Sequence, residues 1–169
     1  MTPTLPATLF DFADPRAADA WHAIDDRVMG GVSRSVLRAD PDGHAVFEGT
    51  VSLDRGGGFA SVRSVPGDRG HPGATACRIE VRGDPREFKL GLLTDDGFDG
   101  IHYQAEFTPA ADAWRTLVLP LADFSPRFRG RVIPDAPPLD AARIRQVGLM
   151  IAGRQAGPFA LGIRRIELA

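Results

Sequence analysis

Apolar and polar residues alternate along most of the chain from residue 33 onward, with a period of two rather than the helical period of about 3.6. The alternation is clearest over residues 44–53, 77–82 and 101–107. Further strands are expected over residues 9–12, 88–94, 114–119, 144–152 and 158–168. About nine short strands separated by turn residues predict an all-β protein, with residues 1–169 forming one antiparallel β-sandwich.

Little helix is expected. Residues 14–21 predict a brief helix, because Asp14 is a suitable N-cap and Pro15 suits the first helical position. Residues 121–138 are expected to form a loop, followed by one helical turn at residues 138–142.

Composition narrows the class of protein. With 43% hydrophobic and 25% charged residues, the chain has the balance of a soluble globular domain. The net charge of −2 gives no electrostatic case for binding nucleic acid or an anionic membrane. No apolar run approaches the roughly 20 residues that span a bilayer, and no signal peptide is visible, so we expect a cytoplasmic protein that does not span a membrane.

The sequence offers no catalytic or metal-binding motif. The four histidines form no pair at metal-ligand spacing, and no Gly-x-Ser-x-Gly elbow is present. Cys77 falls in the inward register of a strand, where a thiol is expected to be inert. The acidic residues 95–100 lack the ligand order of an EF-hand and indicate a hairpin turn. We therefore expect no cofactor and no enzymatic activity, while a calcium site assembled from distant carboxylates stays open.

Two glycine-rich stretches, residues 25–33 and 56–63, are not explained by strand or helix propensity. Adjacent glycines bring a backbone close to another group, and the two stretches are expected to meet at one end of the fold. Asp25, Asp26, Arg63, Arg129 and Arg131 lie in or beside them, and an Asp26–arginine pair would fix their geometry. Structural pairing and ligand recognition are both consistent with this cluster. The candidate binding residues are Asp26, Met29, Gly30, Gly31, Ser33, Gly57, Gly58, Arg63 and Arg129, with Gln155 in a later glycine-containing loop.

A second candidate surface is a polar row on predicted strands. His102, Gln104 and Glu106 alternate with apolar residues, and Lys89 on the partner strand joins them. Such a row suits either a ligand groove or the ordinary solvated face of an antiparallel sheet. Sugar recognition favours exposed flat aromatic rings, and two tryptophans and one tyrosine are few.

Several sequence blocks resemble the CIA30 family (complex I intermediate-associated protein 30). The most specific are V-M-G-G-V-S at residues 28–33 and G-G-F-A-S-V-R at residues 57–63; softer matches include residues 47–49 and 155–159. The resemblance implies a galactose-binding-domain-like jelly roll similar to carbohydrate-binding modules, with no catalytic residues. It also implies protein contacts during assembly of NADH:ubiquinone oxidoreductase, and the arginine- and alanine-rich composition indicates a bacterial member.

Two functions follow as hypotheses. The first is a non-enzymatic module that binds a protein partner, in the assembly of respiratory complex I. The alternative is a module that binds a carbohydrate or another small ligand. A deep polar pocket where the glycine-rich stretches meet would favour the ligand, whereas an exposed apolar patch would favour the protein partner.

Overall fold

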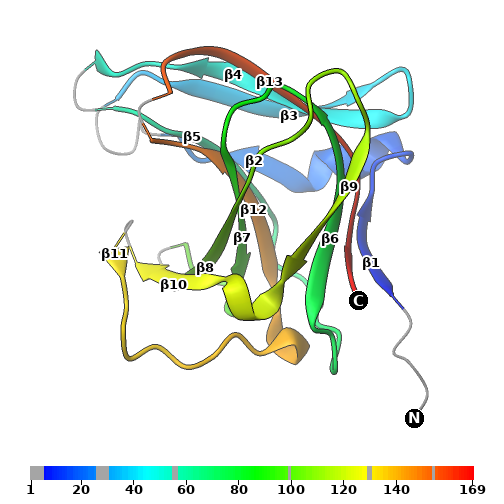
Figure 1. Cartoon of the computed structure of the whole chain (residues 1–169), viewed down its shortest axis with the longest axis vertical. Helices are drawn as coiled ribbons and strands as arrows, with labels where there is room; N and C mark the ends of the chain where they lie inside the picture. Colours follow the sequence, from blue (N-terminus) through cyan, green and yellow to red (C-terminus); the bar gives the residue numbers. More distant parts are fainter. Residues whose placement is uncertain (1–5, 26–30, 55–56, 99, 129–130, 154) are drawn as a thin grey trace.

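Two antiparallel β-sheets pack face to face around the hydrophobic core (Figure 1). The structure is a computed structural model that describes residues 6–25, 31–54, 57–98, 100–128, 131–153 and 155–169. Asp26, Met29, Gly30 and Arg129, which the sequence offered as binding residues, lie outside the described residues. The predicted antiparallel β-sandwich is confirmed.

The first sheet has six strands, and β13 is its centre. β13 is 12 residues long and pairs with three other strands, β1, β4 and β6. The strand order is β3-β4-β13-β6-β9, with β1 also paired to β13. The strands are β1 (Ala7–Asp11), β3 (Arg34–Asp40), β4 (His44–Val51), β6 (Ala76–Gly83), β9 (Arg115–Pro120) and β13 (Gly157–Leu168).

The second sheet has seven strands in the order β11-β10-β8-β7-β12-β5-β2. The sequence alternates along its central strands, so that Leu90, Ala105 and Leu149 face the core and their neighbours face outward. The strands are β2 (Trp21–Ala23), β5 (Ala60–Ser64), β7 (Phe88–Leu93), β8 (His102–Phe107), β10 (Ser125–Phe128), β11 (Arg131–Val132) and β12 (Gln146–Ile151).

Short 3-10 turns connect the strands. The predicted first helix is the 3-10 helix η1 (Pro15–Ala20), in which the Asp14 side chain caps by accepting a hydrogen bond from the Arg16 backbone N–H at 3.0 Å. Two further turns are η4 (Leu121–Asp123) and η5 (Ala141–Arg143). None of the helices found in the described ranges is long and apolar enough to span a bilayer.

The expectation of one loop over residues 121–138 is wrong. That segment contains η4, β10 and β11, and the described part of the chain has 13 strands rather than about nine. β10 carries a proline and no clear alternation, and it is a strand because it pairs with β8, Ser125 opposite Gln104 and Arg127 opposite His102. Tertiary pairing therefore overrides a sequence that is typical of a loop.

Aromatic rings fill the centre of the core. Phe47 and Phe88 are fully buried, and the Phe47 ring lies 4.9 Å from that of Phe159 in an edge-to-face contact. The rings of Phe88 and Phe107 stack with centroids 6.0 Å apart. Each fully buried phenylalanine stabilises the fold by about 1.5–3 kcal/mol relative to an exposed one. The Phe88 ring also lies 6.2 Å from the rings of Phe47 and Phe159, and these edge-to-face contacts join the two sheets.

Candidate functional site

The outer face of the seven-stranded sheet collects half of the described residues that the sequence offered for binding, namely Arg63, Lys89, His102, Gln104 and Glu106. We use the name outer face for the side chains of this sheet that point away from the core. One row of register partners crosses it in the order His22, Arg63, Gly148, Gly91, Gln104 and Ser125. A second row beside it holds Ser61, Met150, Lys89 and Glu106.

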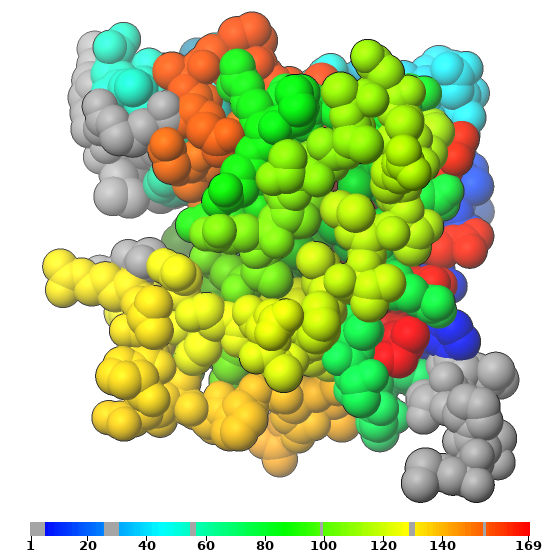
Figure 2. All heavy atoms as spheres, viewed as in Figure 1, coloured from blue at the N-terminus to red at the C-terminus, as the bar shows by residue number. Residues whose placement is uncertain are grey.

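The predicted polar row does share this surface. Lys89 is the register partner of Glu106, while Tyr103, Ala105 and Phe107 on the same strand as Glu106 are buried. Figure 2 shows the molecule hollowed at the left, between the yellow segment of β10 and β11 and the teal and orange segments above it. The structure thus brings His102, Gln104, Glu106 and Lys89 onto one face of the sheet.

Arg63 reaches across the outer face from β5 to β8. Its Nη1 donates a hydrogen bond to the Phe98 carbonyl oxygen at 2.8 Å, and its Nη2 lies 3.2 Å from Nε2 of His102. The guanidinium carbon is also 5.4 Å from the centre of the Phe98 ring. Arg63 thereby fixes the β7–β8 hairpin against β5. The predicted partner Asp26 lies outside the described residues, so an Asp26–Arg63 pair stays a prediction.

The buried carboxylate of Asp25 joins the two glycine-rich stretches. Its Oδ2 accepts a hydrogen bond from the Ser35 backbone N–H at 3.0 Å, and its Oδ1 accepts one from the Ser61 N–H at 3.0 Å and another from the Ser35 hydroxyl. The Ile24 N–H donates to the Ser61 carbonyl oxygen at 2.8 Å. The described ends of the stretches therefore meet, as predicted, through a carboxylate bound to backbone and hydroxyl donors.

Several of the candidate residues at this corner have structural roles. The Ser33 hydroxyl accepts a hydrogen bond from the Ser52 N–H at 2.9 Å and donates one to the Ser52 carbonyl at 3.3 Å. Gly31 and Gly57 are buried, and Gly58 has a φ of +152°, a conformation that favours glycine. These residues define the course of the backbone.

Gln155 ties two loops together with its side-chain amide. Its Nε2 donates to the carbonyl oxygens of Glu87 at 2.8 Å and Ala152 at 2.6 Å, and its Oε1 accepts from the Glu87 N–H at 3.0 Å. Its described hydrogen bonds involve both the NH₂ group and the oxygen of the amide. Gln155 therefore supports the loop that precedes β7.

Two carboxyl groups meet at the edge of the polar row. A hydrogen bond with Glu106 and the negative charge of that residue raise the pKa of Glu87, an effect that nearby Lys89 partly opposes.

Over the described residues, no three His, Cys, Asp or Glu side chains come together as a metal site. In the turn over residues 95–100, Oδ1 of Asp95 accepts a hydrogen bond from the Gly97 N–H at 3.0 Å. Oδ1 of Asp96 accepts one from Nε of Arg145 at 2.7 Å.

An exposed apolar patch lies beside the corner. Val32 and Val36 are 39% and 48% exposed, and together with Pro158 and Thr50 they line a depression of about 550 Å³ on the six-stranded sheet. We call Val32, Val36, Thr50 and Pro158 the valine patch. The sequence analysis missed this patch. Val36 stands where the alternating pattern would place a polar residue, and this departure from the pattern could have indicated an exposed apolar surface.

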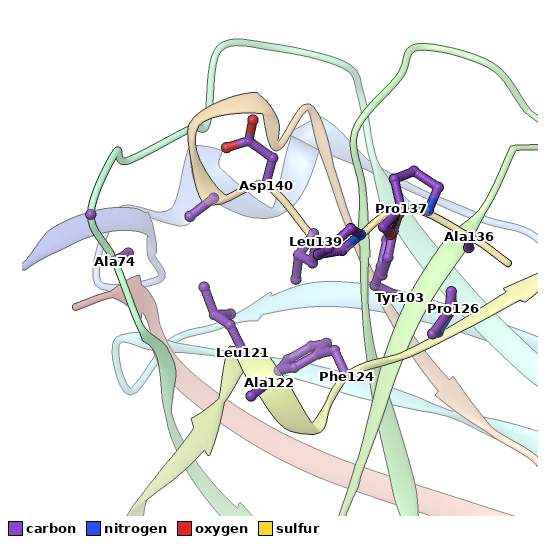
Figure 3. A pocket seen from close by; sticks show the side chains of 13 residues that line it. Ala74, Tyr103, Leu121, Ala122, Phe124, Pro126, Ala136, Pro137, Leu139 and Asp140 are labelled. Carbon is purple, nitrogen blue, oxygen red and sulfur yellow. Dashed lines mark hydrogen bonds between the residues drawn. The ribbon is translucent and has the colours of Figure 1, made fainter. Parts of the chain in front are cut away.

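A second depression of about 680 Å³ lies at the far edge of the sandwich (Figure 3). Leu121 of η4 and Phe124, which follows η4, form one wall, and Pro137 and Leu139 form the other. The Tyr103 hydroxyl donates to the Pro137 carbonyl oxygen at 2.7 Å, and burial raises the pKa of Tyr103. The sequence analysis missed this depression because it is built from the segment expected to be a loop.

Cys77 should be unreactive in the folded protein. Its side chain is fully buried in β6, and burial, with a smaller effect of the Glu167 charge, raises the pKa of the thiol to about 12. Thiol-reactive reagents attack the thiolate, so we expect no labelling by a chromogenic disulfide at about pH 8 until denaturant is added. Fast labelling of the native protein would contradict the predicted inward register.

Comparisons with known proteins agree with this fold. Residues 10–163 match the family described as Complex I intermediate-associated protein 30 (CIA30). Uncharacterized protein C9E9.15 of Schizosaccharomyces pombe is 31% identical over an alignment 172 positions long, gaps included, and the alignment covers 87% of this chain and 78% of that protein.

The solved structures that resemble the chain include carbohydrate-binding modules. The family 11 module of the cellulosomal cellulase Lic26A-Cel5E of Clostridium thermocellum superposes with a TM-score of 0.74 at 18% identity, covering 99% of this chain and 95% of the module. The family 11 module in complex with a β-1,3-1,4-mixed-linked tetrasaccharide superposes with a TM-score of 0.73 at 18% identity, and the match covers 99% of this chain and 96% of the module. An exo-β-agarase superposes with a TM-score of 0.60 at 12% identity, and the match covers 96% of this chain and 24% of the agarase. At these identities the likeness establishes a shared fold.

Proposed function

The chain belongs to the CIA30 family, and on that premise we propose that residues 1–169 form one non-enzymatic binding domain that acts by protein–protein contact. The proposed partners are assembly intermediates of NADH:ubiquinone oxidoreductase, respiratory complex I, in the cytoplasm of a bacterial cell. The family description supports the choice of partner, and the surface beside the glycine-rich corner supports the mode of binding.

The valine patch is the observation that carries this proposal. The depression that Val32 of the first glycine-rich stretch lines is open and partly apolar, and it offers exposed valines. Exposed apolar side chains rimmed by polar ones are typical of protein-binding sites. Arg34 borders the patch, so a partner segment with apolar side chains and a carboxylate would complement it.

A matched pair of valine substitutions tests the proposal. Val36 and Val118 are 48% and 58% exposed on outward-facing positions of the same sheet, on β3 and β9 at its opposite edges. We expect Val36→Lys to lower the recovery of complex I subunits on the immobilised full-length chain by about tenfold or more, since a tenfold loss corresponds to about 1.4 kcal/mol. Val118→Lys should bind like the wild type.

The readout is quantitative mass spectrometry of subunits captured from solubilised membranes that contain complex I. Equal recovery by both variants would remove the valine patch from the interface. Capture of no complex I subunit by the wild-type chain would overturn the assignment of the partner.

Carbohydrate binding is the second candidate function, and the fold likeness to family 11 modules over 99% of the chain favours it. The polar side chains of Lys89, Gln104 and Glu106 would supply hydrogen bonds on the outer face. Titration calorimetry with a β-1,3-1,4-linked tetrasaccharide decides between the two. A dissociation constant below about 1 mM, corresponding to about −4 kcal/mol, would favour the carbohydrate.

A further inference from the structure

The hairpin of β10 and β11 carries exposed apolar and basic side chains at the end of the seven-stranded sheet. Among the strands of the described ranges, β11 pairs only with β10. Phe128 is 38% exposed, Val132 is 55% exposed, and Arg131 beside them is exposed as well. Figure 2 shows this yellow segment projecting at the left of the molecule. We call Arg127, Phe128, Arg131 and Val132 the basic hairpin.

The charge of this segment differs from that of the whole chain. Residues 125–134 contain Arg127, Arg129 and Arg131 and no aspartate or glutamate, whereas the chain has a net charge of −2. Arg129 lies outside the described residues, so the basic hairpin is defined by the other two arginines. Positive charge is thus concentrated where the sheet ends. Such a segment is attracted by anionic lipid headgroups, and each basic residue near the surface adds to the attraction.

Strand register places one arginine and one apolar side chain on each side of the hairpin. Arg127 is the register partner of Val132, and Phe128 is the partner of Arg131. Register partners share a face of a sheet, and successive residues of a strand point to opposite faces. Phe128 and Val132 therefore stand on opposite sides of the two strands.

This two-sided arrangement indicates the kind of partner. A folded protein that docks on one side would cover either Phe128 or Val132 and leave the other in water. A bilayer surrounds a hairpin that enters it, so that lipid contacts both apolar side chains while the arginines extend toward the headgroups. We propose that the basic hairpin inserts into the interface of an anionic lipid bilayer and holds the domain at the membrane surface.

The proposed contact goes beyond the protein-binding function and uses a different part of the fold. The valine patch lies on the six-stranded sheet, whereas the basic hairpin ends the seven-stranded sheet. The two surfaces can therefore be changed separately, and each has its own readout.

The first test measures vesicle binding by the full-length chain. The chain is sedimented with phosphatidylcholine vesicles that contain about 30% phosphatidylglycerol, and with vesicles of phosphatidylcholine alone. We expect binding to the anionic vesicles to be about tenfold stronger, since headgroup charge attracts the arginines. Raising the salt concentration to about 0.5 M should remove most of this difference by screening.

Substitutions in the basic hairpin separate the apolar from the electrostatic contribution. Phe128→Ser combined with Val132→Ser should weaken binding to anionic vesicles by about tenfold or more, because two apolar side chains are lost from the interface. Arg131→Ala should weaken it roughly fivefold at low salt and have little effect at about 0.5 M salt.

The matched controls are Val118→Ser and Arg115→Ala, which should bind the vesicles like the wild type. Both residues are exposed on β9, an edge strand of the other sheet. All the changed side chains are at least partly in solvent, so the variants should melt within about 2 °C of the wild type.

The second test asks whether lipid covers both sides of the hairpin. Phe128→Trp and Val132→Trp each introduce a fluorescent ring, and vesicles with brominated acyl chains quench a ring that enters them. The signal of Trp21 and Trp114 is subtracted with the wild-type chain. We expect quenching of both introduced rings and none in the control Val118→Trp. Quenching of only one ring, or of neither, would overturn the insertion.

Two further results would also overturn the proposal. One is equal binding of the wild type to anionic and neutral vesicles, or binding to neither. The other is calorimetric binding of a polyglutamate peptide without vesicle binding, which would make the hairpin a site for an acidic protein segment.

Failure of the basic hairpin and failure of the proposed function give different results. Val36→Lys should leave vesicle binding unchanged, and the hairpin variants should still capture complex I subunits from detergent-solubilised membranes. Loss of vesicle binding in the wild type with intact capture would reject the basic hairpin alone. Intact vesicle binding without capture would reject only the protein partner.

Discussion

Replacing Gly49 with alanine should destabilise the domain more than other small substitutions on either sheet. Gly49 of β4 is the register partner of Ser35 of β3. An added Cβ would lie 2.0 Å from the Arg34 carbonyl oxygen and 2.7 Å from the Ser35 Cα, and both are backbone atoms that cannot rotate away. β3 must therefore separate from β4. Overpacking absorbed by side chains costs about 1–3 kcal/mol, and a forced backbone shift should cost about 4 kcal/mol or more.

Thermal unfolding followed by circular dichroism measures this effect. At about 2–4 °C per kcal/mol for a chain of this length, Gly49→Ala should lower the melting temperature by roughly 8–16 °C. Gly91→Ala is the matched control, because its added Cβ would meet no atom closer than 3.9 Å and should leave the melting temperature unchanged or slightly raised. A Gly49→Ala protein that melts within about 2 °C of the wild type would contradict the close approach of β3 and β4.

The period-two pattern predicted the strands that carry their own buried face. β6 and β8 alternate clearly, and Cys77, Ile79 and Val81 of β6 are buried as predicted. β13 changes phase at the bulge between Ile163 and Arg165, and β4 buries His44 and Val46 as well as its predicted inner face. β10 and β11 were missed because their residues give no such pattern; Val132 in β11 is exposed, and β10 is held by its pairing with β8. A strand that is stabilised by its neighbour leaves no periodic signal in its own sequence.

The sequence likewise predicted one part of the candidate site and missed another. His102, Gln104 and Glu106 face away from the core because residues alternate along one strand, so the sequence was sufficient to place them on one face. The contact of Arg63 with His102 joins residues 39 apart, and only the folded sheet brings them to 3.2 Å. The pairing of Lys89 with Glu106 depends on the register of β7 against β8, which no local pattern encodes.

The bonds of Asp25 could not be predicted from residue type alone. An aspartate beside arginines indicates an ion pair, yet the described partners of this carboxylate are the backbone N–H groups of Ser35 and Ser61 and the Ser35 hydroxyl. Those partners lie 10 and 36 residues away in the sequence. The two glycine-rich stretches predicted that the chain converges here, but not the bonds that hold it together.

Asp25→Ala should lower the free energy of unfolding by about 3 kcal/mol, because it leaves two buried backbone N–H groups without an acceptor, each costing about 1–3 kcal/mol. The carboxylate is 7% exposed, so water cannot readily replace it. Urea titrations of a graded series measure the loss. Ser35→Ala removes one side-chain bond and should cost about 1 kcal/mol. Asp25→Asn keeps one acceptor oxygen but presents an NH₂ group to the remaining donor. Its loss of unfolding free energy should lie between those of Ser35→Ala and Asp25→Ala. An Asp25→Ala loss no larger than that of Ser35→Ala would mean that β2, β3 and β5 hold the corner without the carboxylate.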